Sequence, residues 1–383
     1  MNKKTIFVSA GEVSGDIHAA DVIKKIKELS PEFQFAGLGG PNMISSGMIS
    51  ITGDVSTMST MGIIEAVRFL YKKSYLFSSC LKYIRKNKIK YLLLIDNQGF
   101  NIPLAKKARK LGVKSIYYFP PPVSIWGEWN TRVISENIDL IIAPFYQDYL
   151  LYKEYGGNAV FSGHPLLDKT SDTIPLREFY EKYGIDRSKK IISIMPGSRH
   201  QEIDTLAFPM LEAAKILIEK YGIQIILPIS HIEFENKLLK IIKFCGLENK
   251  ITIIRNDSYN AMKMADVNIQ ASGTASLESV LLRKPPVICY KISPFSFFVA
   301  KMLVKGKMIG LPNILLKNKF FPELLQKNCN TDNIVKEAIA LLNPDSFAKQ
   351  KREQYFDEIK KSLGDKNVIE RVAQLVIGCV SDA

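Results

Sequence analysis

Asp96 is the residue whose type and position most directly suggest catalysis. It follows the apolar run Tyr-Leu-Leu-Leu-Ile at 91–95, which is typical of a strand buried on both faces. In open α/β sheets, ligands bind beyond the carboxyl ends of the strands. A carboxylate at that place acts as a general base when it reaches a substrate hydroxyl. We therefore predict that Asp96 is a catalytic base; the alternative is a carboxylate that caps the next helix.

Two turns of small residues suggest that the second half of the chain binds a nucleotide. Each follows a strand-like run and opens a helix, with Met-Pro-Gly-Ser-Arg at 195–199 and Ala-Ser-Gly-Thr-Ala-Ser-Leu-Glu at 271–278. Backbone N–H groups at a helix start attract anions, and an arginine there binds a diphosphate unless it is merely solvated. Glu278 lies four residues after Thr274 and so shares its helix face, and a carboxylate there can accept hydrogen bonds from the diol of a ribose. The predicted donor-binding residues of these turns are Gly197, Ser198, Arg199, Ser272, Gly273, Thr274 and Glu278.

A third small-residue turn, Ser-Ala-Gly-Glu-Val-Ser-Gly-Asp at 9–16, follows the first strand-like run. Such a turn lets the backbone approach a ligand, and the alternative is a tight turn in which Ser14 or Asp16 caps a helix. It lacks the Gly-x-Gly-x-x-Gly spacing and the later acidic residue of a dinucleotide site, so NAD is not expected. The predicted acceptor-binding or loop residues are Gly11, Glu12, Ser14, Gly15 and Asp16, together with Asn101.

Positive charge dominates the chain, which has 52 Lys and Arg residues against 38 Asp and Glu residues and a net charge of +14. No acidic residue lies between Glu65 and Asp96, and a second stretch with lysines beside aromatics spans 291–307. Such stretches suit an interfacial helix on anionic lipid. The alternatives are a solvated face over core aromatics and nucleic acid, which we do not expect because no binding motif for it is present. The predicted membrane-surface residues are Arg68, Lys72, Lys73, Lys301 and Lys305.

The apolar runs that precede the turns belong to a repeating pattern of strands and helices. One series lies at 5–8, 33–37, 91–95, 115–119, 140–143 and 159–162, and a second at 191–195, 224–228, 251–255, 267–270 and 286–290. Amphipathic stretches of helix length separate them, which predicts parallel sheets with helices on both faces. We predict an α/β protein of two Rossmann-like domains, at 1–170 and 186–345, whose sheets face across a cleft. A helical tail at 346–383 is expected to pack back on the first domain.

Other features narrow the class of protein. No run of eighteen apolar residues occurs, so no spanning helix is expected. The apolar run near the N-terminus is too short for a signal peptide, which favours the cytosol. The five cysteines and four histidines are scattered, with no Cys-x-x-Cys or His-Glu-x-x-His spacing. Neither a disulfide framework nor a metal site is therefore expected.

Taken together, the motifs resemble those of the lipid-A-disaccharide synthase family, which are inverting glycosyltransferases of the two-Rossmann-domain GT-B type. The matching segments occur in family order across about residues 5–330. They are AGEVSGD (10–16), GLGGPNM (37–43), MGIIEAV (61–67), Asp96 with Phe100 and Asn101, SGHPL (162–166), MPGSRHQEI (195–203), ASGTASLE (271–278), KPPVICYK (284–291), LPNIL (311–315) and PELLQ (322–326).

This resemblance implies a reaction and roles for its residues. The donor would be a UDP-linked diacylglucosamine and the acceptor a diacylglucosamine 1-phosphate, joined by a β-1,6 bond with release of UDP. Asp96 would take the proton of the acceptor 6-hydroxyl. Arg199, with Gly197 and Ser198, would hold the donor diphosphate, and Thr274 and Glu278 would contact phosphate and ribose. Asn313, Glu323 and Gln326 match family positions near the donor.

The resemblance also bears on cofactors, location and assembly. It implies no cofactor and no metal, because protein donors in the 195–199 turn would meet the charge of the diphosphate. It implies a peripheral enzyme on the cytoplasmic face of the inner membrane, in contact with an anionic membrane surface. The resemblance also suggests a homodimer, about which the spacing of the residues gives no information.

The first half of the chain departs from the family pattern. Asn97, Gln98 and Gly99 stand where the family usually has x-Pro-Asp, and Pro-Pro-Pro-Val-Ser-Ile-Trp at 120–126 replaces Ser-Pro-x-Val-Trp-x-Trp. Tyr146 replaces a glutamate. We therefore expect a changed acceptor or changed acyl chains. The alternatives are another UDP-sugar transferase or epimerase of the same fold, and a non-catalytic nucleotide-sugar-binding protein at the membrane.

Overall fold

In a computed structural model, the chain forms two compact units. Unit 1 comprises Met1–Asp168 and Leu363–Ala383, and unit 2 comprises Lys169–Ser362. The structure describes residues 4–11, 13–51, 63–125, 127–170, 175–229, 232–291 and 308–381, without the side chains of 13, 63–73 and 176. Among the predicted site residues, Glu12, Lys301, Lys305 and the side chains of Arg68, Lys72 and Lys73 lie outside this description.

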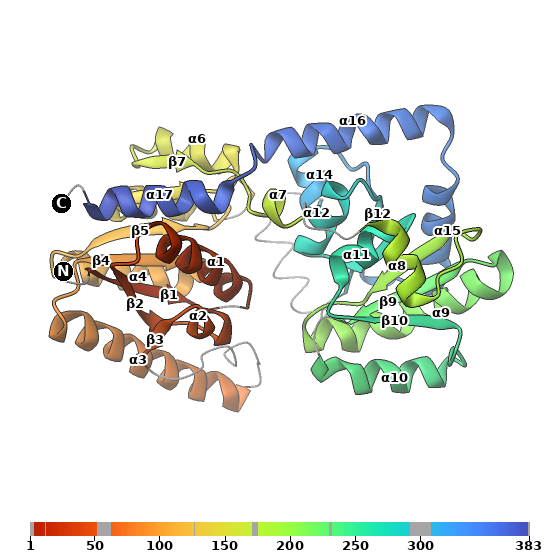
Figure 1. Ribbon diagram of the computed structural model, residues 1–383, viewed down its shortest axis with the longest axis horizontal. Coiled ribbons are helices and arrows are strands. Elements are labelled where there is room, and N and C mark those ends of the chain that lie inside the picture. The colour runs from red at the N-terminus through yellow and green to blue at the C-terminus, as the bar shows by residue number, and fades with distance from the viewer. Residues whose placement is uncertain are drawn as a thin grey trace. The chain divides into compact units, whose positions relative to one another are not determined.

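Unit 1 is a parallel seven-stranded sheet in the order β3-β2-β1-β4-β5-β6-β7. Its strands are β1 (Lys4–Ala10), β2 (Phe33–Leu38), β3 (Met48–Ser50), β4 (Tyr91–Ile95), β5 (Lys114–Tyr118), β6 (Leu140–Ala143) and β7 (Ala159–Phe161). Its helices are α1 (Val13–Leu29), α2 (Pro41–Ser45), α3 (Ile63–Lys86), α4 (Gln98–Arg109), α5 (Trp129–Asn137), α6 (Tyr146–Glu154), α7 (Leu166–Lys169) and α17 (Val368–Ser381). Figure 1 shows α1 and α17 running along this sheet.

Unit 2 repeats the same topology with a parallel six-stranded sheet in the order β10-β9-β8-β11-β12-β13. Its strands are β8 (Ile191–Met195), β9 (Gln224–Ile229), β10 (Ile251–Arg255), β11 (Val267–Ala271), β12 (Pro286–Tyr290) and β13 (Glu323–Leu325). Its helices are α8 (Leu176–Tyr183), α9 (His200–Tyr221), α10 (Glu235–Phe244), α11 (Ser258–Met264), α12 (Thr274–Leu281), α14 (Leu311–Leu316), α15 (Thr331–Leu342) and α16 (Ser346–Ser362).

The apolar runs form strands because helices cover both faces of each sheet. Every residue of β4 is buried. Leu92 and Leu94 enter one hydrophobic core, whereas Leu93 and Ile95 enter the core on the other face. Alternate residues of a strand point to opposite faces, so a continuous apolar run is needed here. The prediction of two Rossmann-like α/β domains is confirmed, and the short strands β3 and β13 are additions to the predicted set.

The predicted C-terminal tail is divided between the two units. Helix α17 buries Val372 and Val376 in the same core as Val22 and Ile23 of α1, within unit 1. Helix α16 belongs to unit 2, where Phe356 stacks on Phe321 with ring centroids 5.9 Å apart. The aromatic face of α16 therefore packs within unit 2, and the chain passes to unit 1 only at Leu363.

Candidate functional site

Asp96 and the three predicted small-residue turns follow the strands at which each sheet reverses its order. In unit 1, β1 lies beside β4, with Ala10 paired to Ile95. In unit 2, β8 lies beside β11, with Met195 paired to Gln270. Ligands of open α/β sheets bind at the carboxyl ends of strands at such a switch point. In each unit, the predicted turns therefore lie together at the carboxyl ends of the strands of its own sheet.

Asp96 lies in a strained turn directly after β4. Its φ is 52° and that of Asn97 is 45°, both in the left-handed region that costs a non-glycine residue about 1–3 kcal/mol. Two buried side chains hold this turn through the Asp96 carbonyl oxygen, since Tyr117 Oη donates to it at 2.7 Å and Asn101 Nδ2 at 2.8 Å. Burial and the charge of Asp96 raise the pKa of Tyr117, so the phenol stays protonated as a donor.

Asn101 connects the ends of the two strands at this switch point. Its side chain is fully buried in α4, accepts a hydrogen bond from Ser9 Oγ at 2.7 Å and donates to the Ser9 carbonyl at 3.2 Å. It also donates to the Ile95 carbonyl at 3.1 Å. The amide therefore fixes the geometry beneath Asp96, and its polar atoms are directed at the chain itself.

The turn after β1 packs against the turn that carries Asp96. A Cβ on Gly11 would overlap the side-chain amide of Asn97, and one on Gly15 would meet the Cβ of Asp96 at 3.6 Å. The absence of a side chain at Gly11 therefore lets the two turns approach each other closely. Ser14 is exposed in the first turn of α1. Of the predicted group, Gly11, Gly15 and Asn101 are therefore brought together with Asp96.

Asp16 has a different environment from the rest of this group. Its buried carboxylate accepts hydrogen bonds from the backbone N–H groups of Gly40 at 2.8 Å, Asn42 at 3.0 Å and Met43 at 3.1 Å, and from Asn42 Nδ2 at 2.8 Å. It lies within α1 and caps the amino end of α2 instead of its own helix. Its oxygens are engaged in holding two helices of the fold.

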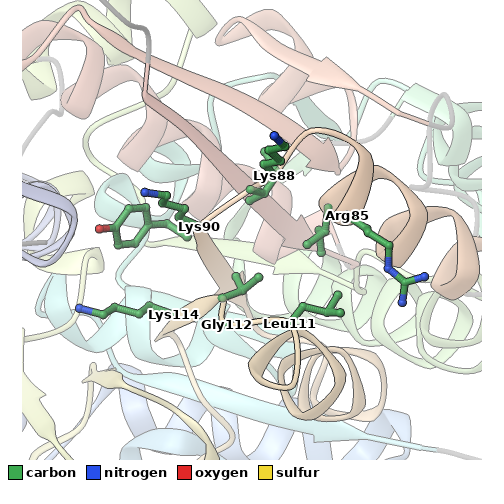
Figure 2. A pocket seen from close by; sticks show the side chains of 10 residues that line it. Arg85, Lys88, Lys90, Leu111, Gly112 and Lys114 are labelled. Carbon is green, nitrogen blue, oxygen red and sulfur yellow. The ribbon is translucent and has the colours of Figure 1, made fainter.

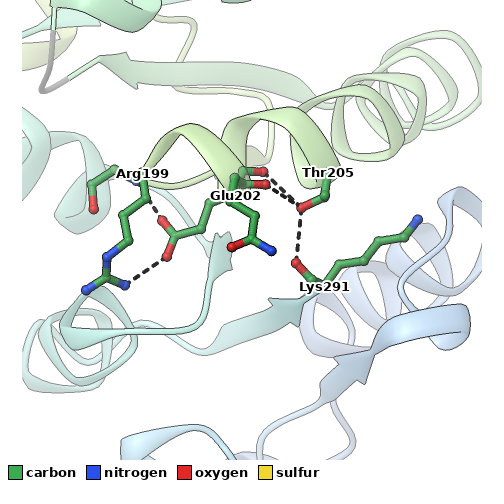
Figure 3. A network of polar contacts seen from close by, with 6 residues as sticks. Arg199, Glu202, Thr205 and Lys291 are labelled. Atoms are coloured by element: carbon green, nitrogen blue, oxygen red, sulfur yellow. Dashed lines mark hydrogen bonds and ion pairs between the residues drawn. The ribbon is translucent and has the colours of Figure 1, made fainter. Parts of the chain in front are cut away.

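In unit 2, the turn after β8 binds a carboxylate of its own chain (Figure 3). Ser198 N donates to Glu202 Oε2 at 2.9 Å, and Arg199 Nη1 donates to Glu202 Oε1 at 3.1 Å. Gly197 has a φ of 131°, and a Cβ there would overlap Glu202, so only glycine fits. The Ser198 N–H predicted for the diphosphate is used internally. Arg199, whose side chain is 67% exposed, is the cation that this turn presents.

By contrast, the turn after β11 is open. Gly273 and Thr274 are exposed, and a Cβ on Gly273 would meet no atom within 4 Å. Helix α12 begins at Thr274, so its first N–H groups lie at this edge with the positive end of the helix dipole. Glu278 in the same helix accepts a hydrogen bond from Tyr259 Oη at 3.1 Å. Burial raises the pKa of Glu278, against the opposing effects of Tyr259 and Lys169.

Asn313 and Glu323 form a buried network in unit 2. Asn313 Nδ2 donates to Glu323 Oε1 and to the Phe321 carbonyl, each at 2.8 Å. Glu323 Oε1 also accepts from Gly310 N at 3.0 Å, so it holds the chain that enters α14. Gln326 follows β13 with a φ of 52° at the carboxyl edge of the sheet. Asn313 and Glu323 thus hold the chain around α14 in place, and Gln326 lies at the carboxyl end of β13.

Three residues outside the predicted set complete these arrangements: Tyr117, Glu202 and Tyr259. A glutamate at the third position of a helix is a known capping signal, so Glu202 could have been predicted. In the sequence, Tyr117 cannot be told from the other residues of a buried strand, and Tyr259 cannot be told from the other residues of a short helix. Their partners lie 21 and 19 residues away in sequence, so no local pattern shows them.

A cavity of about 530 Å³ lies elsewhere in unit 1, at the amino ends of β4 and β5. Its charged lining residues are Arg85, Lys88, Lys90 and Lys114. Figure 2 shows that these four side chains do not converge on a common point. The cavity is at the opposite edge of the sheet from Asp96 and contains none of the predicted site residues.

Two Rossmann-like units with their turns at the switch points define the class as a two-domain α/β protein of the GT-B type. Solved structures share this fold at low sequence identity. A Staphylococcus aureus MnaA-UDP co-structure has a TM-score of 0.64 at 15% identity, covering 99% of this chain and 97% of that one. Acinetobacter baumannii MurG has a TM-score of 0.59 at 13% identity, covering 98% and 99%.

Sequence relatives identify the family. A lipid-A-disaccharide synthase of Sulfurihydrogenibium sp. is 33% identical over 388 residues, covering 97% of each chain. That of Persephonella marina is 34% identical over 383 residues, covering 97% of this chain and 98% of its own. The profile of the lipid-A-disaccharide synthetase family matches residues 6–376. The chain belongs to this family, so the predicted glycosyltransferase class and lipid A disaccharide formation are confirmed at the level of the family.

Proposed function

We propose that the chain transfers a diacylglucosamine from a UDP-linked donor to a diacylglucosamine 1-phosphate and releases UDP. The observation that carries this proposal is the position of the family motifs, which follow β1 and β4 in unit 1 and β8 and β11 in unit 2. These are the positions at which an α/β sheet binds ligands. Family membership supplies the reaction, and the relatives from Sulfurihydrogenibium sp. and Persephonella marina are lipid-A-disaccharide synthases.

The proposed reaction is a single displacement with inversion. The acceptor 6-hydroxyl oxygen bonds to C1 of the donor sugar, and the bond from C1 to the diphosphate oxygen breaks. The hydroxyl proton passes to Asp96, and UDP leaves with the electron pair. Arg199 offsets the charge that develops on the diphosphate, which is where preorganised donors accelerate a transfer most. The helix start at Thr274 supports phosphate binding, and Glu278 supports ribose binding.

We also place the enzyme on the cytoplasmic face of the inner membrane, on an anionic surface. Support comes from the net charge of +14 and the acid-free interval between Glu65 and Asp96. Within the described residues, no helix is both long and apolar enough to cross a bilayer. Replacing Arg68, Lys72 and Lys73 by glutamine is expected to weaken flotation with anionic vesicles and to slow transfer. Unchanged flotation and rate would contradict this part of the proposal.

The reaction itself is tested by analysis of the product. The purified chain is given UDP-linked diacylglucosamine in mixed micelles, with and without diacylglucosamine 1-phosphate, and the lipids are examined by mass spectrometry. We expect a tetra-acylated disaccharide monophosphate only when both substrates are present. A changed donor sugar without added acceptor would favour an epimerase. Donor binding without any new product would favour a non-catalytic binding protein.

A further inference from the structure

Glu202, in the first turn of α9, is a nearly buried carboxylate that binds the candidate diphosphate turn. Its side chain is 15% exposed, against 67% for that of Arg199. Its two oxygens bind two successive residues of the turn, Ser198 through the backbone and Arg199 through the guanidinium. The carboxylate therefore lies beneath the turn, and the arginine extends from it toward solvent.

The surrounding structure holds Glu202 at this place. Gly197 leaves room for it, because any Cβ at that position would overlap the glutamate. Thr205, one turn further along α9, donates to the Gln201 carbonyl at 2.8 Å and to the Lys291 carbonyl at 3.1 Å, where the chain leaves β12 (Figure 3). The start of α9 is thus tied to a neighbouring strand, which limits how far Glu202 can move.

From this geometry we infer that Glu202 is a positioning residue that preorganises Arg199 for the diphosphate of the nucleotide. The inference rests on the proposed function. A guanidinium carries five N–H donors in a planar fork, and Glu202 is bonded to Nη1, one of its three nitrogens. An arginine fixed in this way loses less side-chain entropy when a phosphate binds its remaining donors. Glu202 contacts no ligand in this scheme and acts only through Arg199.

A carboxylate so close to a diphosphate site could instead oppose binding by charge repulsion. The burial of Glu202 beneath the turn argues for positioning, because the ligand approaches the exposed guanidinium from the solvent side. The two roles predict opposite changes in affinity when the charge is removed. Glu202→Gln is suited to separate them, since its amide oxygen still accepts from Ser198 N while the ion pair with Arg199 is lost.

The experiment measures binding of UDP and of uridine by calorimetry to the full chain and to Glu202→Gln. We expect UDP affinity to fall about tenfold, the scale of one strongly coupled pair, and uridine affinity to stay unchanged. In an Arg199→Met background, Glu202→Gln is expected to have no further effect on UDP affinity. Glu219→Gln is the matched control, because Glu219 lies in the same helix and pairs with Lys250 away from the turn.

Each contrary result has a distinct meaning. Tighter UDP binding by Glu202→Gln would overturn positioning in favour of repulsion. An equal loss of uridine and UDP affinity, or a full effect in the Arg199→Met background, would show a structural role of the turn and overturn the inference. Equal UDP affinity of the parent chain and Glu202→Gln would also overturn the inference, but it would leave the proposal of a UDP-linked donor unaffected. Failure of the unaltered chain to bind UDP would overturn the proposed donor, and the inference with it.

Discussion

The phenolic oxygen of Tyr117 lies 2.7 Å from the carbonyl oxygen of Asp96, so a residue of β5 holds the turn that carries the predicted base. Asn101 Nδ2 reaches the same carbonyl oxygen at 2.8 Å. Two consecutive left-handed residues would relax without such restraints. The position of the Asp96 carboxylate therefore depends on hydrogen bonds made by its backbone.

Replacing Tyr117 by phenylalanine is expected to lower kcat about 10- to 100-fold, because small displacements of a reacting group have effects of that size. UDP affinity is expected to remain unchanged, since the donor turns belong to unit 2. Tyr118→Phe is the matched control. Tyr118 is the next residue of β5 and equally buried, and its hydroxyl has no hydrogen-bond partner among the described residues. An equal kcat for Tyr117→Phe and the parent chain would contradict this account.

Gly197→Ala is expected to destabilise unit 2 by roughly 1–3 kcal/mol, because alanine disfavours a φ of 131° and its Cβ would overlap Glu202. The measurement is denaturant unfolding of the full chain followed by a probe in unit 2. Gly273→Ala is the control, since a Cβ there meets open space. Equal losses of stability in both variants would contradict the claim that the position of Glu202 requires glycine at residue 197.

Asp148 gives a prediction about stability and pH. Burial raises its pKa to about 6, although hydrogen bonds from Ser124 act in the opposite direction. The folded chain binds the proton more tightly than the unfolded chain, so the contribution of Asp148 to stability is full at low pH and is lost as the pH rises through about 6. Asp148→Asn is expected to be more stable than the parent by about 2–3 kcal/mol near pH 8.

The control for this prediction is the same comparison at acidic pH. Asparagine keeps an oxygen that can accept the hydrogen bond from Ser124 N, which is 2.8 Å long in the parent chain. Near pH 4 the two chains should therefore unfold at similar denaturant concentrations. A constant difference in unfolding free energy between the two pH values would show that titration of Asp148 is not its cause.

Glu278 gives a prediction about donor binding and pH. Burial raises its pKa, so it is protonated at a higher pH than an ordinary glutamate. If its carboxylate accepts the ribose hydroxyls, UDP affinity should fall as the pH is lowered through that raised pKa and be full above it. Glu278→Gln should bind UDP more weakly at neutral pH and lose this dependence. Calorimetric titrations over a pH series would check both, and an identical pH profile in the variant would exclude this role.

The fold and the position of the candidate site could be predicted because both depend on local patterns. The run at 91–95 is apolar at every position, as a strand covered on both faces must be, and Asp96 ends it. The partners of polar side chains could not be predicted in this way. Asp16 binds the backbone of Gly40, and Asn101 joins Ser9 to Ile95, because the fold brings together residues that are distant in sequence.

The same limit applies in unit 2. Asn313 and Glu323 stand in motifs near the expected donor, but motif position does not tell whether a polar side chain faces a ligand or the chain itself. Their mutual hydrogen bond and the Gly310 N–H group engage them within the protein. Arg199 and Thr274, by contrast, are exposed at the carboxyl ends of the strands, where a ligand can reach them.

We propose that Asp96 is the base of an acceptor-dependent transfer. The measurement that tests it most directly is UDP release from UDP-linked diacylglucosamine, with and without diacylglucosamine 1-phosphate, for the parent chain and Asp96→Asn. We predict release that requires the acceptor and falls about 100-fold or more in the variant, with UDP affinity unchanged. Release by Asp96→Asn at the rate of the parent chain would contradict the account.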